Sequence, residues 1–158
     1  MNAARFSQFG GPEVLEIVDL PDPHAGPGQI RVAVRAAGIN ATDWKVRKGL
    51  MGGELPQTTG HDVAGVVDEI GEGVADVSVG DRVFGLCDDG TGTGAGAAEL
   101  AVLSDYAPIP SALGFVDAAG LPVALETATR GLDTLGVGPG STLLINGATV
   151  TLVILAEG

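Results

Sequence analysis

The sequence predicts a mainly β domain with a few helices, and three observations lead to this fold class. Glycine occurs 26 times and proline 9 times among 158 residues, whereas aromatic residues make up 4%. Chains so rich in turn residues and small side chains favour short strands over long helices. Apolar residues make up 45%, which is enough for a folded core. Short apolar runs bounded by Gly, Pro or Asp recur before residue 116, and no long helical period occurs there.

Five of these runs are predicted to form strands, at the spacing of a barrel or a sandwich. They are residues 13–19, 30–36, 62–70, 81–87 and 98–103. The run at 30–36 alternates apolar and polar residues, as a strand with one buried face does.

One longer helix is predicted at residues 123–135, where the chain is rich in alanine and leucines recur at helical spacing. Pro122 limits this helix on its N-terminal side, and Gly136 is expected to stop it. The segment STLLINGA at 141–148 then predicts a short apolar strand that runs into a turn. A β-rich part, a helix and the first strand of a further unit indicate a two-domain parent that is cut near its hinge.

Charge and cysteine content exclude several classes of partner. The chain has 8 Lys and Arg against 20 Asp and Glu, a formal charge of -12, so nucleic acid and anionic membranes are not expected as partners. A short stretch is nevertheless basic, and we interpret it as a solvated face: Arg31, Arg35, Lys45, Arg47 and Lys48. A single cysteine, Cys87, excludes an intramolecular disulfide and is expected to be a small buried side chain. No leader or long apolar span begins the chain, which predicts a cytoplasmic protein.

Several separated motifs carry a family resemblance. They are RFSQFGGPEVLEIVDLPDP, RAAGINATDWKVRKG, GHDVAGVVDEIGEGVADVSVGDRVFG, AAGLPVALETATRGL and GPGSTLLINGA, in this order. The chain resembles the quinone oxidoreductase (zeta-crystallin-like) branch of the medium-chain dehydrogenase/reductase superfamily. The resemblance implies a GroES-like β-barrel catalytic domain at 1–122, a linking helix and loop at 123–140, and at 141–158 a first Rossmann-type strand followed by a C-terminal strand. The family's Rossmann domain, which binds NADPH, is expected to be largely absent.

The same resemblance predicts that no zinc is bound. Zinc-dependent relatives have a cysteine, a histidine and another thiolate where this chain has Asn40, His61 and the apolar pair Pro122 and Val123. A tetrahedral catalytic site needs three protein ligands, and only His61 remains as a candidate. We therefore interpret His61 as a residue of the barrel wall or of the cleft.

The resemblance also suggests site residues. Asn40 and Thr127 are the expected catalytic residues, and with Asn146 they are expected to bind the cofactor; Trp44 and His61 are expected to contact the substrate. Simpler interpretations remain open for two of them. Asn40 suits a strained turn after Gly38 and Ile39, and Thr127 suits a helix residue that bonds back to its own turn. Asp43 is an alternative cap for a short helix in DWKVRKG.

Two glycine-rich stretches are not expected to bind phosphate. The stretch at 90–98 precedes a strand and not a helix, and the stretch at 136–141 also precedes its strand, whereas a dinucleotide fingerprint follows one. After NGA the family continues with a glycine turn, but residues 149–155 here read TVTLVIL, which favours a strand. This strand either rejoins the barrel or forms a hairpin across Asn146 and Gly147, and its apolar character predicts self-association.

The resemblance implies hydride transfer from NADPH to a quinone or another α,β-unsaturated carbonyl (enone). As this isolated chain, the catalytic domain is expected to be weak or inactive. A stand-alone GroES-like module that binds small molecules or partners without catalysis is the alternative. A complete enzyme with unrelated chemistry is the weakest hypothesis, because the sequence shows no nucleophile and base pair and no metal cluster.

Overall fold

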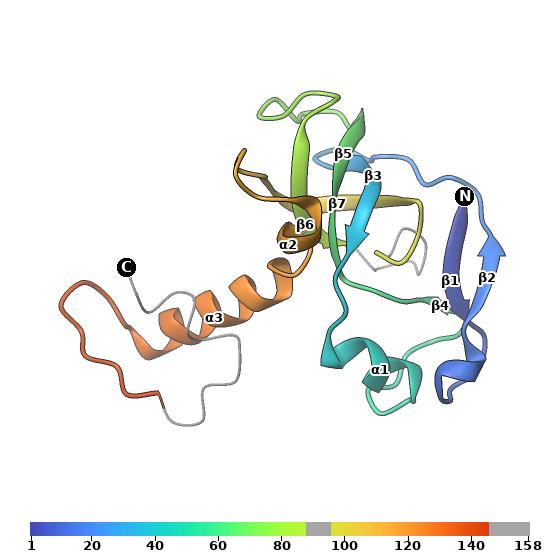
Figure 1. Ribbon diagram of the computed structural model, residues 1–158, viewed down its shortest axis with the longest axis horizontal. Helices are drawn as coiled ribbons and strands as arrows, with labels where there is room; N and C mark the ends of the chain where they lie inside the picture. Colours follow the sequence, from blue (N-terminus) through green and yellow to red (C-terminus); the bar gives the residue numbers. More distant parts are fainter. Residues whose placement is uncertain (88–95, 146–158) are drawn as a thin grey trace.

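A closed antiparallel barrel forms the centre of the computed structural model, which describes residues 1–87 and 96–145 (Figure 1). Its strands are β3 (Ile30–Ala37), β5 (Asp62–Ile70), β6 (Arg82–Cys87) and β7 (Leu100–Pro108), paired in the order β3-β5-β6-β7. β7 closes the barrel on β3, with Ile30 opposite Leu103. Closure leaves no unpaired sheet edge in the barrel.

A second sheet of three strands lies beside the barrel, in the order β2-β1-β4. It contains β1 (Asn2–Phe6), β2 (Glu16–Asp19) and the two-residue β4 (Gln57–Thr58). β1 is the central strand, because it pairs with both β2 and β4, and both pairings are antiparallel.

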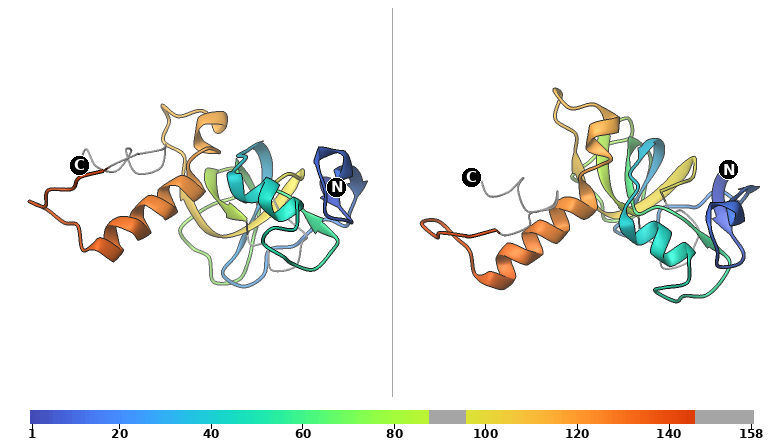
Figure 2. Two further views of the ribbon diagram at one scale, coloured as in Figure 1. Left: turned by 90° about the horizontal axis from the view of Figure 1, so that it is seen from below. Right: turned by 60° about the horizontal axis from the view of Figure 1, so that its bottom comes forward.

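The helices are short except for one. A 3-10 turn, η1 (Pro12–Val14), precedes β2; α1 (Ala41–Arg47) follows β3, and α2 (Phe115–Ala118) leads into α3 (Pro122–Leu135). The views in Figures 1 and 2 agree that α3 begins at the barrel and extends away from it. Leu135 at its end is 68% exposed. No helix in the described ranges is long and apolar enough to cross a membrane.

The barrel interior is aliphatic. Its fully buried side chains come from all four strands: Ile30, Val32, Val63, Val67, Val83, Ala101 and Leu103. Cys87 is buried in the same cluster, which confirms the prediction that it is a core residue. β-branched and small side chains of this kind fill the interior of a small barrel well.

The predicted elements match the structure closely in the barrel. The strand at 62–70 has the predicted limits, and the helix predicted at 123–135 begins one residue earlier, at Pro122. Pro122 fits there because the first turn of a helix needs no backbone donor. Gly136 ends the helix in the left-handed conformation, with φ 64°.

Three strand predictions need correction. The strand predicted at 13–19 begins only at Glu16, because Pro12 starts a 3-10 turn. The strand predicted at 98–103 begins at Leu100 and continues to Pro108, since β6 offers a partner along that length. Residues 141–145 form no strand: they have no regular secondary structure, and a strand needs a neighbour that accepts and donates its backbone hydrogen bonds. β1 was missed, because five residues with two alanines give little periodicity.

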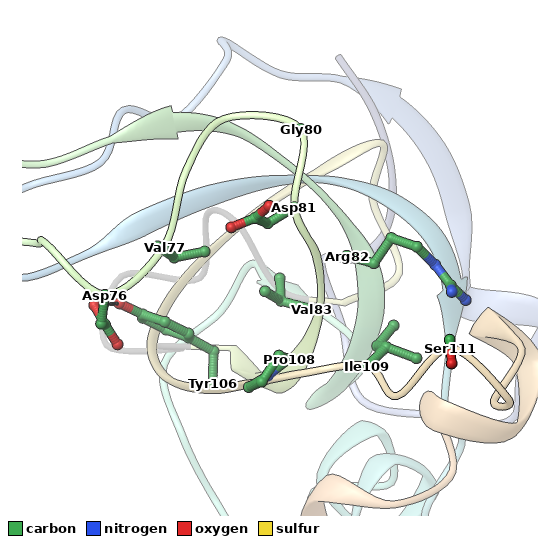
Figure 3. A pocket seen from close by; sticks show the side chains of 10 residues that line it. All are labelled: Asp76, Val77, Gly80, Asp81, Arg82, Val83, Tyr106, Pro108, Ile109 and Ser111. Carbon is green, nitrogen blue, oxygen red and sulfur yellow. Dashed lines mark hydrogen bonds between the residues drawn. The ribbon is translucent and has the colours of Figure 1, made fainter.

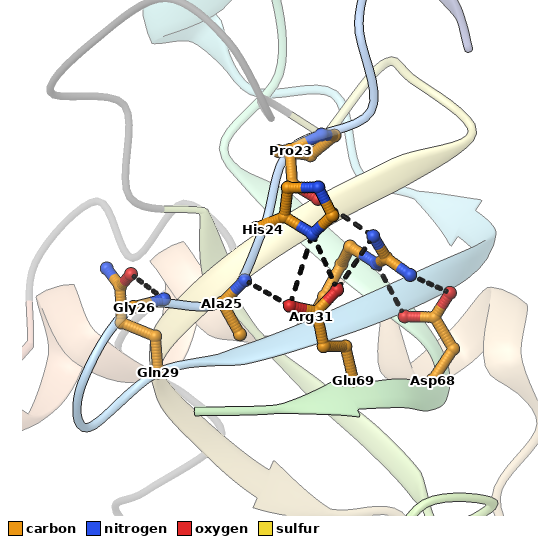
Figure 4. A network of polar contacts seen from close by, with 8 residues as sticks. All are labelled: Pro23, His24, Ala25, Gly26, Gln29, Arg31, Asp68 and Glu69. Carbon is orange, nitrogen blue, oxygen red and sulfur yellow. Dashed lines mark hydrogen bonds and ion pairs between the residues drawn. The ribbon is translucent and has the colours of Figure 1, made fainter. Parts of the chain in front are cut away.

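A polar network fastens the loop before β3 to the barrel (Figure 4). The Arg31 guanidinium makes two hydrogen bonds to Asp68, at 2.9 and 3.2 Å, and an ion pair with Glu69 at 2.8 Å. Glu69 also accepts from the His24 ring at 3.1 Å and from the backbone N–H of Ala25. The hydrogen bond from His24 and the charge of Arg31 hold the pKa of Glu69 below its ordinary value.

We expect Glu69→Gln to lower stability at neutral pH but not in acid. A carboxylate whose pKa is lowered by folding stabilises the fold above its unfolded value of about 4.5, and this contribution disappears as the pH falls through the folded value. Urea midpoints of the two proteins should therefore differ at neutral pH and converge as the pH falls below 4.5 and through the lowered folded pKa. A gap that widened in acid would contradict this assignment.

Candidate active site

Three segments that are distant in the sequence meet at one end of the barrel. They are the N-terminus of α1, the start of β5 and the first turn of α3, the elements shown in Figure 1. Polar side chains join them: Asn40 and Asp43 from α1, His61 and Asp62 from β5 and the residue before it. The backbone N–H of Val123 completes the group.

Asp62 is the centre of this group. Its side chain is only 1% exposed, although an aspartate in water is charged at neutral pH. One carboxylate oxygen, Oδ2, accepts from Asn40 Nδ2 at 3.0 Å, and the other, Oδ1, accepts from the backbone N–H of Val123 at 3.0 Å. Burial raises the pKa of Asp62, while these two hydrogen bonds act in the opposite direction. Asp62 thus joins α1 to α3 through one buried carboxylate.

Asn40 is held on two sides. It is the N-cap of α1, and its backbone N–H donates to Asp43 Oδ2 at 2.6 Å. A carboxylate only accepts, so the Asn40 side chain faces Asp62 with its amide nitrogen. The amide oxygen also takes part in the capping box of α1, where it faces the backbone N–H of Asp43. One further lone pair of this oxygen and the second amide N–H are then the groups that a ligand can use. The extended backbone of Asn40 (φ -113°, ψ 162°) shows that the strained-turn interpretation is wrong.

His61 forms a pair with Asp43. Its Nδ1 lies 2.8 Å from Asp43 Oδ1, and the carboxylate, 8% exposed, is more deeply buried than the 28% exposed imidazole. Nδ1 must donate to this acceptor, so the neutral ring carries its lone pair on Nε2. The alternative role of Asp43, a cap for the short helix, is also fulfilled, because its second oxygen accepts from the Asn40 N–H.

The remaining predicted residues lie on the two helices. Trp44 follows Asn40 by one helical turn on α1 and is 41% exposed. Thr127 follows Val123 by one turn on α3 and is exposed, and its hydroxyl donates to Glu126 at 3.4 Å and not to its own preceding turn. Asn146 lies outside the described residues. The structure therefore joins Asn40 and His61 through Asp43. Trp44 lies one helical turn from Asn40 on α1, and Thr127 lies one turn from Val123 on α3.

Sequence reasoning missed Asp62. Its only signal was an acidic residue at the start of a strand that is otherwise buried and apolar. Charged side chains are rarely fully buried without partners, so such a residue predicts a polar contact with another segment. The partner, a backbone N–H of a helix 61 residues later, has no signature in the sequence.

Three of the positions compared with zinc-dependent relatives, Asn40, Pro122 and Val123, offer no thiolate or imidazole. The fourth, His61, has its Nδ1 bonded to Asp43. Within residues 1–87 and 96–145, no three His, Cys, Asp or Glu side chains are arranged to hold a metal ion.

A separate hollow of about 490 Å³ lies at the turn before β6 and contains none of the predicted residues (Figure 3). Its floor is apolar, formed by Val77, Val83 and Ile109. The polar side chains around it are bonded to the wall: the Tyr106 hydroxyl donates to Asp76 at 2.9 Å, and Arg82 donates to the Leu113 carbonyl at 2.7 Å. We assign no ligand to this hollow.

Comparison with known proteins identifies the fold family. Residues 26–120 match the family model described as the alcohol dehydrogenase GroES-like domain. The quinone oxidoreductase of Rattus norvegicus is 35% identical over 155 residues, which cover 94% of this chain and 46% of that protein. The trans-enoyl reductase fsr4 of Gibberella fujikuroi is 40% identical over 124 residues, which cover 77% of this chain and 36% of that protein.

A solved structure gives the same result in three dimensions. The Escherichia coli quinone oxidoreductase complexed with NADPH superimposes with a TM-score of 0.73 at 28% identity, covering 85% of this chain and 41% of that one. This chain thus spans less than half of the length of these relatives. The barrel, the linking helix and the matching motifs agree with all of these comparisons, and the chain belongs to the alcohol dehydrogenase GroES-like domain family, in the quinone oxidoreductase branch of the medium-chain dehydrogenase/reductase superfamily.

Proposed function

We propose that this chain is the substrate-side domain of a zinc-independent, NADPH-dependent oxidoreductase that reduces a quinone or an enone. The observation that carries the proposal is the orientation of Asn40 by the buried carboxylate of Asp62. A fixed amide with an acceptor and a donor suits recognition of a carboxamide or a carbonyl. The relatives, a quinone oxidoreductase and a trans-enoyl reductase by name, support the substrate class.

The residues would divide the work as follows. NADPH, when bound, supplies the hydride. Asn40 and Thr127 would hold the nicotinamide amide, and Trp44 and His61 would contact the substrate. Reduction of a quinone or an enone by hydride also consumes a proton. A protonated His61 can donate this proton from Nε2 to the substrate oxygen, while Asp43 stabilises the imidazolium. Zinc is not needed for this scheme.

We further propose that the isolated chain is a weak catalyst in the cytoplasm. Residues 149–155 contain no glycine, whereas a pyrophosphate-binding turn depends on glycines that let the backbone approach the phosphates. The expected partner is a small quinone or enone, without nucleic acid or membrane. Self-association through the apolar segment at 149–155 belongs to the same proposal; that segment lies outside the described residues.

A non-catalytic binding module is the second candidate. It is favoured by the closed barrel, whose aliphatic core is formed by its own four strands. Such a domain can fold and bind a ligand without a second domain.

NADPH titration and quinone turnover separate the two candidates. The oxidoreductase proposal expects only weak quenching of protein fluorescence by NADPH, together with slow NADPH-dependent loss of a 1,4-quinone. Tight NADPH binding would contradict the proposed lack of a pyrophosphate-binding turn. Quinone binding without NADPH binding or turnover would favour the binding module. If the 158-residue chain turned over quinone at the rate of an ordinary enzyme, the proposal of weak catalysis would be wrong, and the proposal of an oxidoreductase would still hold.

We expect Asn40→Ala to lower kcat about tenfold or more, because it removes the proposed contacts to the reacting carbonyl or the nicotinamide amide. It also removes the bond to Asp62, so stability must be measured beside activity. Thr127→Val is the cleaner variant, since the hydroxyl is exposed and its one bond is long. It should leave the urea midpoint unchanged and lower kcat/KM severalfold; an unchanged kcat/KM would remove Thr127 from the mechanism.

A further inference from the structure

Asn40, Trp44 and Lys48 form a row along helix α1. They follow one another at intervals of four residues, which places them on one helix face at about 5–6 Å per step. Asn40 belongs to the candidate active site, and the Trp44 indole, 41% exposed, is its neighbour in the row. A planar molecule whose carbonyl reaches Asn40 along this helix face can therefore lie beside the indole.

Two ammonium groups lie close to the indole. Lys48 Nζ lies 5.3 Å from the Trp44 ring centroid and Lys45 Nζ lies 5.8 Å from it. Neither lysine forms an ion pair with another described residue, so both charges remain available to a ligand. In a chain with only 8 Lys and Arg and a formal charge of -12, this local concentration of positive charge contrasts with its surroundings.

The other charged side chains around α1 are bonded to the protein, although they keep their charges. Arg47 is tied to the neighbouring loop, because its Nε donates to the Gly10 carbonyl and its own carbonyl accepts from the Gly10 N–H. Glu13 stands near Arg47 and Lys48, and its carboxylate accepts from the Gly11 N–H at 2.8 Å. On the inner side of α1, Asp43 is paired with His61. Arg47 and Glu13 have opposite charges that offset each other, so the two lysines beside the indole leave this surface with a net positive charge.

The apolar surroundings favour an aromatic ligand over a simple anion. Ile39 is 92% exposed beside Asn40, and Leu50 and Met51, just after the helix, are 67% and 59% exposed. An indole with cations above it and aliphatic side chains nearby offers stacking area and charge together.

We propose that the substrate of this site is a planar quinone or enone that carries an acidic substituent, a carboxylate, sulfonate or phosphate, on the side away from the reacting carbonyl. The conjugated ring stacks on Trp44, and Lys45 and Lys48 bind the anion. The proposal rests on the oxidoreductase function proposed above for the carbonyl end and concerns the other end of the substrate.

Trp44 is the only tryptophan in the chain, so its fluorescence reports binding at this surface. The probes are anthraquinone-2-sulfonate and its neutral analogue 2-(hydroxymethyl)anthraquinone, titrated without NADPH. N-acetyltryptophanamide corrects for absorption of light by the probes. We expect the sulfonate to bind about fivefold to tenfold more tightly, with the preference lost at high ionic strength.

Matched variants locate the effect. Lys45→Gln/Lys48→Gln should remove the preference, and Lys48→Gln alone should reduce it. Arg35→Gln, which removes one exposed positive charge on β3, should retain it. Equal affinity of the two probes, or equal loss of preference in Arg35→Gln and Lys48→Gln, would overturn the proposal. Because binding is measured without NADPH, the sulfonate preference tests the anion site separately from turnover. A preference for the sulfonate that is unchanged in Asn40→Ala would keep the anion site and count against the proposed carbonyl contact of Asn40.

Discussion

Replacement of Asp62 by alanine is expected to lower the free energy of unfolding by about 3 kcal/mol. The side chain is 1% exposed and accepts from Asn40 and from the first turn of α3, so its removal leaves two donors without their acceptor. The variant also loses the contact that joins α1 to α3. Urea denaturation followed by circular dichroism measures the change, and Trp44 fluorescence reports whether α1 loosens first.

The pH dependence of this difference has a defined sign. Burial raises the pKa of Asp62 in the folded protein above its ordinary value of 3.8. At a pH between these two values, the folded wild-type protein therefore binds a proton more readily than the unfolded chain does. The wild-type advantage over Asp62→Ala is therefore largest in acid and narrows as the pH rises through the folded pKa. Asp68→Ala is the control: Asp68 is 32% exposed in its pair with Arg31, so a loss of less than about 1 kcal/mol is expected. If Asp62→Ala and Asp68→Ala lost similar free energies of unfolding, Asp62 would stabilise the fold no more than an ordinary surface ion pair does.

Gly71→Ala is expected to destabilise the barrel by about 3 kcal/mol or more. A Cβ at this position would lie 1.8 Å from the Gly26 carbonyl oxygen and 2.8 Å from the Gln29 carbonyl oxygen. Both are backbone atoms, so no side-chain rotation can relieve the overlap. The backbone N–H of Gly71 also donates to Gln29 at 2.8 Å, and displacement of the loop would break that bond. The urea midpoint and the thermal midpoint should both fall.

Gly73→Ala, two residues later, is the matched comparison. Gly73 has φ 86°, but a Cβ there meets no atom within 4 Å. The expected loss is only the cost of a left-handed alanine, about 1 kcal/mol. If Gly73→Ala proved the more damaging of the two, backbone conformation and not close approach would dominate this turn.

The candidate site was predictable in part. Asn40, Trp44 and His61 were identified from motifs; the structure places Asn40 and Trp44 one helical turn apart at α1 and pairs His61 with Asp43 of the same helix. Their fixed geometry depends on Asp43 and Asp62, and only the first of these was considered from the sequence, as a cap. Asp62 was not identified from the sequence, because its two hydrogen-bond partners lie 22 positions earlier and 61 positions later in the chain. Thr127 remains a prediction, since its hydroxyl is bonded only to Glu126.

The sequence by itself determined the β-rich class, the limits of β5, the start and stop of α3 and the family, because these follow from local periodicity, Pro and Gly positions and motif order. Only the tertiary structure decided that β7 closes the barrel on β3. It also decided that residues 141–145, STLLI, do not form a strand, because they have no pairing partner among the described residues. It also decided that a buried carboxylate joins α1 to α3. Hydrogen bonds between distant segments leave no period in the sequence, since each needs a partner that only folding brings near.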